Sequence, residues 1–327
     1  MSELLVLSHD DVRRLLRMDE CIDLMESVLT DLAQGRVWLP LRFVVRPPEE
    51  PTLMGLMPAH RSEPQPSYGL KAICIFPENP AKGLDAHQGG VLLFDGETGI
   101  LQALLDGSAV TAVRTAAVSA VATRALARAD ARELAILGAG VQARSHLEAM
   151  AHARDFERAR VWSRTAEHAQ TLAAEADAPF PVEAVDSAQA AVDGADVVCT
   201  VTSAREPVVQ RAWLKDGTHV NAVGSSIPST RELDADTIRD AGLFADARES
   251  LVNESGDYLM AVEEAGIGPD HIRAELGEVL VDPGKGRRSD EELTVFKSLG
   301  LAVEDLAVAE HLHDRARADG AGTVVPF

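Results

Sequence analysis

The stretch ELAILGAGVQARSHLEAM, residues 133–150, decides the fold. It begins with apolar residues typical of a buried strand, passes through a turn that contains two glycines, and continues in a pattern typical of a helix. The turn has the form G-x-G-x-x-A, which is used by folds that bind dinucleotides. Gly138 allows a tight turn, Gly140 lets the backbone approach a pyrophosphate, and Ala143 lets helix and strand pack closely. The free N–H groups of the helix N-terminus suit phosphate. The predicted cofactor contacts here are Gly138, Ala139, Gly140, Val141 and Gln142.

The chain from residue 133 onward alternates between strand and helix. The candidate strands are ELAILG, RARVWS, DVVCTV, THVNAV and LFAD, and helical segments such as 167–176 lie between them. Strands that alternate with helices in this way are typical of a parallel, doubly wound sheet. We therefore expect an α/β domain around the glycine turn.

The residues before position 130 show a different pattern of apolar residues and turn residues. Residues 18–35 have apolar side chains at spacings of three and four, which predicts an amphipathic helix. Residues 40–106 alternate short apolar runs with turn residues, which predicts a mostly antiparallel sheet with GETG, 96–99, as a hairpin turn. Residues 108–126 are rich in alanine and are expected to form a buried helix.

The C-terminal part begins with a segment, 282–292, whose composition suggests disorder. The following residues, 293–318, are expected to form one last helix. Its apolar positions Leu299, Val303 and Leu306 need a partner surface.

Length and composition exclude several classes of protein. The 327 residues suit two domains, or one domain interrupted by another. With 31 Lys and Arg against 52 Asp and Glu, the net charge is −21, which disfavours nucleic acid and anionic lipid as partners. No apolar stretch is long enough to span a membrane, and the acidic N-terminal residues do not suit a signal peptide. The scattered cysteines Cys21, Cys74 and Cys199 suit a reducing cytoplasm.

The end of the second candidate strand, RVWSRT, bears on the choice of nucleotide. A carboxylate at this position would bind the ribose 2′-hydroxyl of NAD(H). Here the residues are Ser163, Arg164 and Thr165. A guanidinium flanked by hydroxyl groups suits a 2′-phosphate, so NADP(H) is the preferred cofactor and NAD(H) is possible. The alternative is that Arg164 is only a solvated turn residue.

Several long stretches, in the same order along the chain, resemble the ornithine cyclodeaminase/μ-crystallin family. They are LKAICIFPEN (70–79), AHQGGVLLFDGETG (86–99), LLDGSAVTAVRTAAVSA (104–120), ILGAGVQARSH (136–146), NAVGSSIPSTRELD (221–234) and TVFKSLGLAVEDLA (294–307). Members use a nicotinamide cofactor on a carbon that bears an amino or imino group. Some cyclise ornithine with loss of ammonia, others reduce ketimines or imino acids, and others interconvert an amino acid and its oxo acid.

The resemblance implies a Rossmann dinucleotide-binding domain inserted in a mixed α+β domain that binds substrate and makes a homodimer. The implied boundaries are 1–118 plus 298–327 for the substrate-binding and dimerisation domain and 119–297 for the Rossmann domain. By the family pattern, Arg42 in the strand LRFVV, Lys71 and Arg114 contact the substrate carboxylate. For Arg114, a buried ion pair with an Asp such as Asp106 is the alternative.

The resemblance also suggests further site residues. Gln88, on a turn with His87, would border the substrate, and Thr115 would contact a cofactor phosphate. No metal is expected, because His311 and His313 lie two apart on a helix and are read as solvated. The remaining predicted cofactor contacts are Val201, Thr202, Ser203, Val223, Gly224, Ser225 and Ser298.

The sequence departs from the cyclodeaminase pattern at two acidic positions. Ser226 stands where that branch has Asp, and Gly55 stands where it has Glu. Both departures remove negative charge that a second ammonium group would need. We therefore expect an NADP(H)-dependent reductase of 2-imino carboxylates, closer to the μ-crystallin branch, with Lys71 or an ordered water managing the proton. The alternatives are an amino-acid dehydrogenase or cyclodeaminase, and a protein that binds NADP(H) or a small ligand without turnover.

Overall fold

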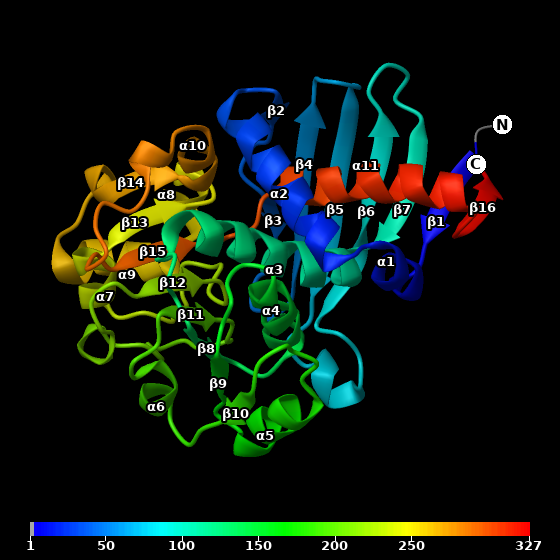
Figure 1. Ribbon diagram of the computed structural model, residues 1–327. Coiled ribbons are helices and arrows are strands. Elements are labelled where there is room, and N and C mark those ends of the chain that lie inside the picture. The colour runs from blue at the N-terminus through cyan, green and yellow to red at the C-terminus, as the bar shows by residue number, and fades with distance from the viewer. Residues whose placement is uncertain (1–2) are drawn as a thin grey trace. The chain divides into compact units, whose positions relative to one another are not determined.

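The computed structural model describes residues 3–327, and the chain divides into two compact units. Unit 1 combines the residues up to 114 with those from 300 onward, and unit 2 consists of residues 115–299. Each unit has its own sheet of eight strands (Figure 1). One α/β unit is thus inserted in a mixed unit, which confirms the fold class predicted from the sequence.

The sheet of unit 1 has the order β16-β1-β7-β6-β5-β4-β2, with β3 paired to β4. Strands β4 to β7 form an antiparallel meander, as the alternating texture predicts, and β1 runs parallel to β7. The elements of this part of the chain are β1 (Glu3–Leu7), α1 (His9–Leu15), α2 (Met18–Ala33), β2 (Val37–Trp38), β3 (Phe43–Val45), β4 (Leu53–Arg61), β5 (Ser67–Ile75), η1 (Asn79–Lys82), β6 (His87–Asp95), β7 (Leu101–Asp106), α3 (Gly107–Leu126), α11 (Ala302–Asp319) and β16 (Thr323–Pro326).

One face of this sheet is covered by α11, which packs across β4, β5 and β6 and against α2 (Figure 1). The side chains on the covered face are buried at every second position, as in Met57 and Ala59 of β4 and in Lys71 and Ile73 of β5. A Cβ atom on Gly69 would lie 3.1 Å from Leu306, so the helix lies close against the strand. The predicted need of the C-terminal helix for a partner surface is thereby met.

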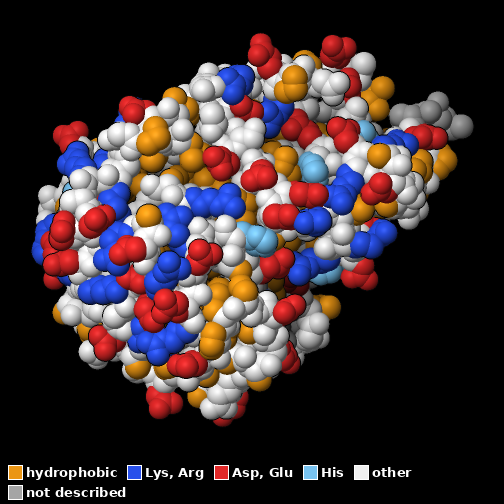
Figure 2. Space-filling view, viewed as in Figure 1, with side chains coloured by type: hydrophobic (Ala, Val, Ile, Leu, Met, Phe, Trp, Pro, Cys, Tyr) orange, Lys and Arg blue, Asp and Glu red, His pale blue; other side chains and the backbone are white. Residues whose placement is uncertain are grey.

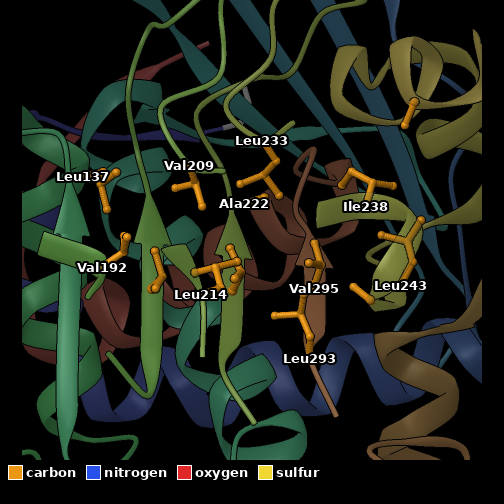
Figure 3. Packing of buried hydrophobic residues seen from close by; sticks show 14 of the residues in the cluster. Leu137, Val192, Val209, Leu214, Ala222, Leu233, Ile238, Leu243, Leu293 and Val295 are labelled. Atoms are coloured by element: carbon orange, nitrogen blue, oxygen red, sulfur yellow. The ribbon is translucent and has the colours of Figure 1, made fainter. Parts of the chain in front are cut away.

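The sheet of unit 2 is parallel throughout, in the order β10-β9-β8-β11-β12-β15-β13-β14. Small and branched apolar side chains pack on the sheet and form a continuous core (Figure 3). The elements are β8 (Glu133–Leu137), α4 (Val141–Ala151), β9 (Arg158–Trp162), α5 (Ala166–Glu175), β10 (Val182–Ala184), α6 (Ala188–Val192), β11 (Val197–Thr200), η2 (Arg211–Trp213), β12 (His219–Ala222), α7 (Ala235–Asp240), β13 (Gly242–Ala245), α8 (Arg248–Glu254), α9 (Gly256–Ala265), η3 (Pro269–His271), β14 (Ile272–Glu275), α10 (Leu276–Val281), η4 (Pro283–Lys285) and β15 (Thr294–Lys297).

The order of strands in this sheet reverses between β8 and β11. From β8 the chain moves outward through β9 to β10, and it then returns to place β11 on the other side of β8. In open parallel sheets, ligands bind at such a switch point, beyond the carboxyl ends of the strands. The glycine turn that follows β8 lies at this point.

Two predictions for the C-terminal part are wrong. Residues 294–297 are not helical but form β15, a fully buried strand inside the parallel sheet, and the helix begins only at Ala302. Four apolar or buried residues in a row cannot distinguish a strand from a helix by periodicity. The segment 282–292 is ordered, because the guanidinium of Arg287 donates to the carbonyl oxygens of Leu126 and Gly217 and the segment contains η4.

The surface agrees with a mixed but acidic composition. On the face drawn in Figure 2, Asp and Glu side chains are interspersed with Lys and Arg. Within residues 3–327, no helix is both long and apolar enough to cross a lipid bilayer.

Candidate functional site

The glycine turn of unit 2 is held against the strand that lies across the switch point. Gly138 has a φ of 121°, which disfavours any other residue, and a Cβ atom there would lie 2.6 Å from the carbonyl oxygen of Val201. Around Gly140, the N-cap of α4, a Cβ atom would meet nothing within 4 Å. Ala143 is fully buried. The turn is therefore tight, and its second glycine faces open space at the start of a helix, as a phosphate site requires.

Other predicted contacts near this turn differ in exposure. Ala139 follows Gly138 in the turn, and Val141 at the start of α4 is 61% exposed.

The carbonyl oxygen of Gln142 lies 2.7 Å from Nδ1 of the buried His146. Burial lowers the pKa of His146 to about 4, so this imidazole stays neutral near neutral pH.

Ser163, Arg164 and Thr165 lie directly after β9, and Thr165 is the N-cap of α5. Arg164 and Thr165 are exposed, and the backbone N–H of Thr165 donates to Oγ of Ser163 at 3.4 Å. The structure thus places the guanidinium at the end of the strand next to β8. This is the position where an acidic residue would stand in an NAD(H) site.

The carboxyl ends of β11 and β12 are joined by one buried carboxylate, Glu232. Its Oε1 accepts from the backbone N–H of Thr202 at 2.6 Å and from the Thr202 hydroxyl at 2.7 Å. Its Oε2 accepts from the hydroxyl of Thr200 at 2.8 Å and from the backbone N–H of Gly224 at 2.7 Å. The predicted contacts Val201, Thr202, Ser203, Val223, Gly224 and Ser225 belong to the two segments that Glu232 joins.

The sequence reasoning missed Glu232, although it lies inside the quoted stretch NAVGSSIPSTRELD. Two other predicted residues lie near these strand ends. Ser225 is buried and its hydroxyl donates to the carbonyl oxygen of Thr230. The backbone N–H of Ser298, after β15, donates to the carbonyl oxygen of Ala222 at 3.0 Å. Ser226 is half-buried in the segment after β12.

In unit 1, Lys71 and Arg114 are buried together with two carboxylates of α11. Nζ of Lys71 lies 3.2 Å from Oδ1 of Asp305 and 2.5 Å from the hydroxyl of Thr111. Nε of Arg114 lies 3.3 Å from the same Asp305 oxygen, and its Nη1 lies 2.7 Å from Oε2 of Glu304. These four charged side chains are each 5% exposed or less. The structure thus brings together two of the three predicted carboxylate contacts.

The structure contains the buried ion pair that was the alternative for Arg114, but its partners are Asp305 and Glu304 and not Asp106. Asp106 instead accepts from the backbone N–H of Ala109 in the first turn of α3. The acidic residues that pair with Arg114 were not singled out from the sequence. The signal was present, since Glu304 and Asp305 stand side by side in the otherwise apolar run LGLAVEDLAVA, and buried charges need partners.

Arg42 is connected to this cluster through Gly300. Arg42 does not lie in a strand as predicted, since β3 begins one residue later, and its Nη2 donates to the carbonyl oxygen of Gly300 at 3.1 Å. Gly300 has a φ of 79°, and a Cβ atom there would lie 2.7 Å from Nη1 of Arg114. One glycine therefore accepts a bond from the first arginine and leaves room for the second.

Of the remaining predicted site residues, His87 and Gln88 are placed differently by the structure. Gln88 and His87 lie in strand β6 rather than on a turn before it, because the ladder with β5 already begins at His87. The amide of Gln88 donates to the carbonyl oxygen of Asp85 at 2.9 Å. Gly55 pairs with Ile73 on the covered face that also bears Lys71. Thr115, in α3, is buried and is the first residue of unit 2.

His311 and His313 are not fully solvated as expected, since their side chains are only 27% and 18% exposed. Within the part of the chain that the structure describes, no three His, Cys, Asp or Glu side chains are arranged to hold a metal ion.

Burial changes the charge state of Lys71. It lowers the pKa of this amine from 10.5 to about 8, although Asp305 opposes the shift, and the positive charge of Arg114 lowers the pKa further. The amine is therefore mostly protonated at pH 7, yet it loses its proton far more readily than an ordinary lysine. A cation of this kind can both attract a carboxylate and exchange a proton.

A model of the ornithine cyclodeaminase/mu-crystallin family matches residues 2–320. The chain belongs to this family. Ketimine reductase mu-crystallin of Mus musculus is 41% identical over 312 residues, which cover 94% of this chain and 96% of the relative.

Two solved structures of the family share the fold over nearly the whole chain. Δ1-pyrroline-2-carboxylate reductase of Thermococcus litoralis, in complex with NADH and L-proline, has a TM-score of 0.94 at 37% identity, covering 98% of this chain and 99% of the other. An archaeal alanine dehydrogenase dimer with bound NAD has a TM-score of 0.93 at 31% identity, with both chains covered completely.

The contact of Lys71 with a substrate carboxylate that the family pattern predicts would depend on pH, because the pKa of this amine is low. The affinity for a small carboxylate such as pyruvate, measured by calorimetry, should be constant below about pH 8 and should fall by up to about tenfold per pH unit above it. The reason is that raising the pH through the pKa removes the positive charge of Lys71. In Lys71→Arg the charge persists, so the decline should disappear, whereas Lys71→Met should bind weakly at every pH. An unchanged decline near pH 8 in Lys71→Met would assign it to another group.

Proposed function

We propose that this protein is an NAD(P)H-dependent reductase of 2-imino carboxylates, including cyclic ketimines. The observation that carries the proposal is the buried group of Lys71 and Arg114 in unit 1, with Arg42 joined to it through Gly300. Cations on a rigid strand and helix suit a substrate carboxylate that must be held in a fixed orientation. Positioning of this kind is the main means by which a protein accelerates hydride transfer.

In the proposed reaction, different residues of the chain bind the substrate and donate the proton. The bound cofactor supplies a hydride for the C=N carbon. Arg114 and Lys71 bind the carboxylate next to that carbon, with Arg42 as a third contact. The nitrogen gains a proton as the carbon gains the hydride, and the Lys71 ammonium, or a water held by it, donates that proton. A pKa of about 8 suits the donor, because the ammonium is populated at pH 7 and its proton is readily given up.

Two positions favour imino acids over diamino acids. Gly55 lies on the same covered face as Lys71 and carries no carboxylate, and Ser226 offers only a hydroxyl. A second ammonium group buried there would have no negative partner from these positions. The alternatives are an amino-acid dehydrogenase or a cyclodeaminase of the same fold, which release ammonia, and a binding protein without turnover. The relatives that reduce ketimine and pyrroline carboxylates support the reductase.

For the cofactor, we propose that NADP(H) is preferred and NAD(H) is possible. Support comes from the exposed guanidinium of Arg164 between the hydroxyl groups of Ser163 and Thr165 at the end of β9. The similar solved structures hold NADH or NAD, so the preference rests on the residues of this chain. The predicted phosphate contact Thr115 and the segments around Thr202, Gly224 and Ser298 belong to the same proposal.

We further propose a homodimer formed through the substrate-binding part of the chain, 1–118 plus 298–327, with 119–297 binding the cofactor. Large apolar side chains are exposed on β2, β3 and β5, where Trp38 is 64%, Phe43 59% and Tyr68 50% exposed. Exposed apolar side chains gathered in one region are typical of protein interfaces. The three cysteines, Cys21, Cys74 and Cys199, are scattered along the sequence without a CxxC pattern, which favours a cytoplasmic location.

The first test concerns the reaction. Oxidation of NADPH should accompany reduction of a cyclic ketimine carboxylate, whereas ornithine should give little or no proline. Arg114→Ala should raise KM and lower kcat, because the carboxylate is then held weakly before and during hydride transfer. Arg114→Lys, which keeps the charge but loses the forked geometry, should retain part of the activity.

Ser226→Asp should depress ketimine reduction and favour substrates with a second ammonium group, since it restores a negative partner. If the native protein forms proline from ornithine faster than it reduces any imino acid, the cyclodeaminase alternative replaces this proposal.

The second test concerns the cofactor. Arg164→Ala should weaken NADPH binding by roughly 1.5–3 kcal/mol, because a charge-assisted hydrogen bond to the 2′-phosphate is lost. NADH affinity should change little, since NADH has no phosphate there. Titration of the two cofactors by fluorescence measures both values. Equal affinity of the native protein for NADPH and NADH would contradict the preference.

The third test concerns assembly. Sedimentation at micromolar concentration should show a dimer, and Phe43→Asp should shift it towards the monomer by placing a charge in the apolar interface. Val281→Asp, at a residue of α10 that is 49% exposed, is the matched control and should leave the dimer unchanged. A native protein that sediments as a stable monomer would overturn the assembly proposal.

A further inference from the structure

The charge and surroundings of Glu232 distinguish it from an ordinary buried carboxylate. It is fully buried, and both of its oxygens accept two hydrogen bonds each, from the two threonines and from the backbone of Thr202 and Gly224. Two of the four donors are backbone N–H groups, which cannot accept a bond in return, so this set favours the ionised form, in which both oxygens only accept.

A second buried pair lies beside this carboxylate and holds the backbone of Glu232 in place. Nζ of Lys297, at the end of β15, lies 3.0 Å from Oδ2 of Asp257 in α9, and both side chains are at most 1% exposed. Oδ1 of Asp257 accepts from the backbone N–H groups of Glu232 and Leu233 at 2.7 and 2.9 Å. Burial raises the pKa of the Glu232 carboxyl; of the two charges of the pair, Lys297 opposes this rise and Asp257 adds to it.

The hydrogen bonds of Glu232 lie on one particular side of the switch point in the sheet. Glu232 joins the carboxyl ends of β11 and β12, on the side of the switch point that lies away from β9. In doubly wound sheets the adenosine half of a dinucleotide lies over the strands that follow the glycine turn, and the nicotinamide half lies over the other set. The segments that Glu232 holds are therefore on the nicotinamide side, whereas Ser163–Thr165 are on the adenosine side.

We infer that Glu232 is a positioning residue, which fixes the ends of β11 and β12 so that they receive the nicotinamide half of the cofactor. It does not touch the cofactor, since its oxygens are occupied by Thr200, Thr202 and Gly224. The two segments lie so close together that the Glu232 side chain has no room to move. A Cβ atom on Gly224 would collide with both Thr202 and the Glu232 carboxylate. The inference rests on the proposed cofactor and not on the proposed substrate.

The arrangement makes an isosteric substitution disruptive. In Glu232→Gln the amide nitrogen must face one of the two oxygen positions, and each position receives a backbone N–H that cannot rotate away, from Thr202 or from Gly224. An N–H group would then oppose another N–H, so one segment must move. The threonine hydroxyls alone could adapt by rotation.

The experiment compares the whole cofactor with a fragment that lacks nicotinamide. The affinities of NADPH and of 2′-phospho-ADP-ribose are measured by calorimetry, or those of NADH and ADP-ribose if the native protein prefers NADH. Glu232→Gln should weaken the whole cofactor tenfold or more and the fragment less than threefold. Glu264→Gln is the matched control, because it replaces one of the two surface oxygens that accept from the neighbouring Arg231 at 2.8 Å and should change neither affinity.

A milder variant covers the case in which Glu232→Gln does not fold. Thr200→Val removes one hydroxyl donor and leaves both backbone bonds, so it should weaken the whole cofactor by about two- to fourfold and leave the fragment unchanged. Equal loss for cofactor and fragment, or no loss in a folded Glu232→Gln protein, would overturn the inference. A native protein that binds neither NADPH nor NADH would instead overturn the proposed function.

Discussion

The sharing of Asp305 between Lys71 and Arg114 is the constraint on which unit 1 depends. Two cations lie within reach of one carboxylate oxygen in a place where none of the three side chains meets appreciable solvent. Such an arrangement is stable only if strand β5, helix α3 and helix α11 keep their positions, since removing one partner leaves a buried charge uncompensated. The same fixed positions keep the cations rigid, and burial lowers the pKa of Lys71 although Asp305 opposes this shift.

Buried charges have a different role in unit 2 from the one they have in unit 1. There a carboxylate and a Lys–Asp pair hold backbone segments, not other functional side chains. The glycines of this region complement them, because Gly138 and Gly224 allow neighbouring strand ends to approach within distances that a side chain would prevent. In the proposed function, backbone groups of unit 2 would receive an anionic cofactor, and cations of unit 1 would receive a small carboxylate.

Much of this could be predicted from the sequence. The glycine turn, the βαβ alternation and the antiparallel meander follow from local patterns, because turn chemistry and side-chain periodicity act over a few residues. The strand 294–297 could not be predicted, since four buried residues in a row fit a helix or a strand equally well, and only pairing with β12 and β13 decides. The cations Lys71 and Arg114 were found from family motifs. Their partners Glu304 and Asp305, and the carboxylate Glu232, escaped notice because their meaning lies in contacts with residues far away in the sequence.

The insertion of unit 2 into unit 1 has a consequence for the order in which the chain is made. Unit 2 is one continuous segment, so every strand of its sheet has been synthesised before Gly300 emerges. Unit 1 is different, because the helix that covers its sheet and carries Glu304 and Asp305 belongs to the last residues of the chain. Domains generally fold as units during synthesis. Until α11 arrives, the meander has an open apolar face that carries the cation Lys71, so the nascent chain completes unit 1 last.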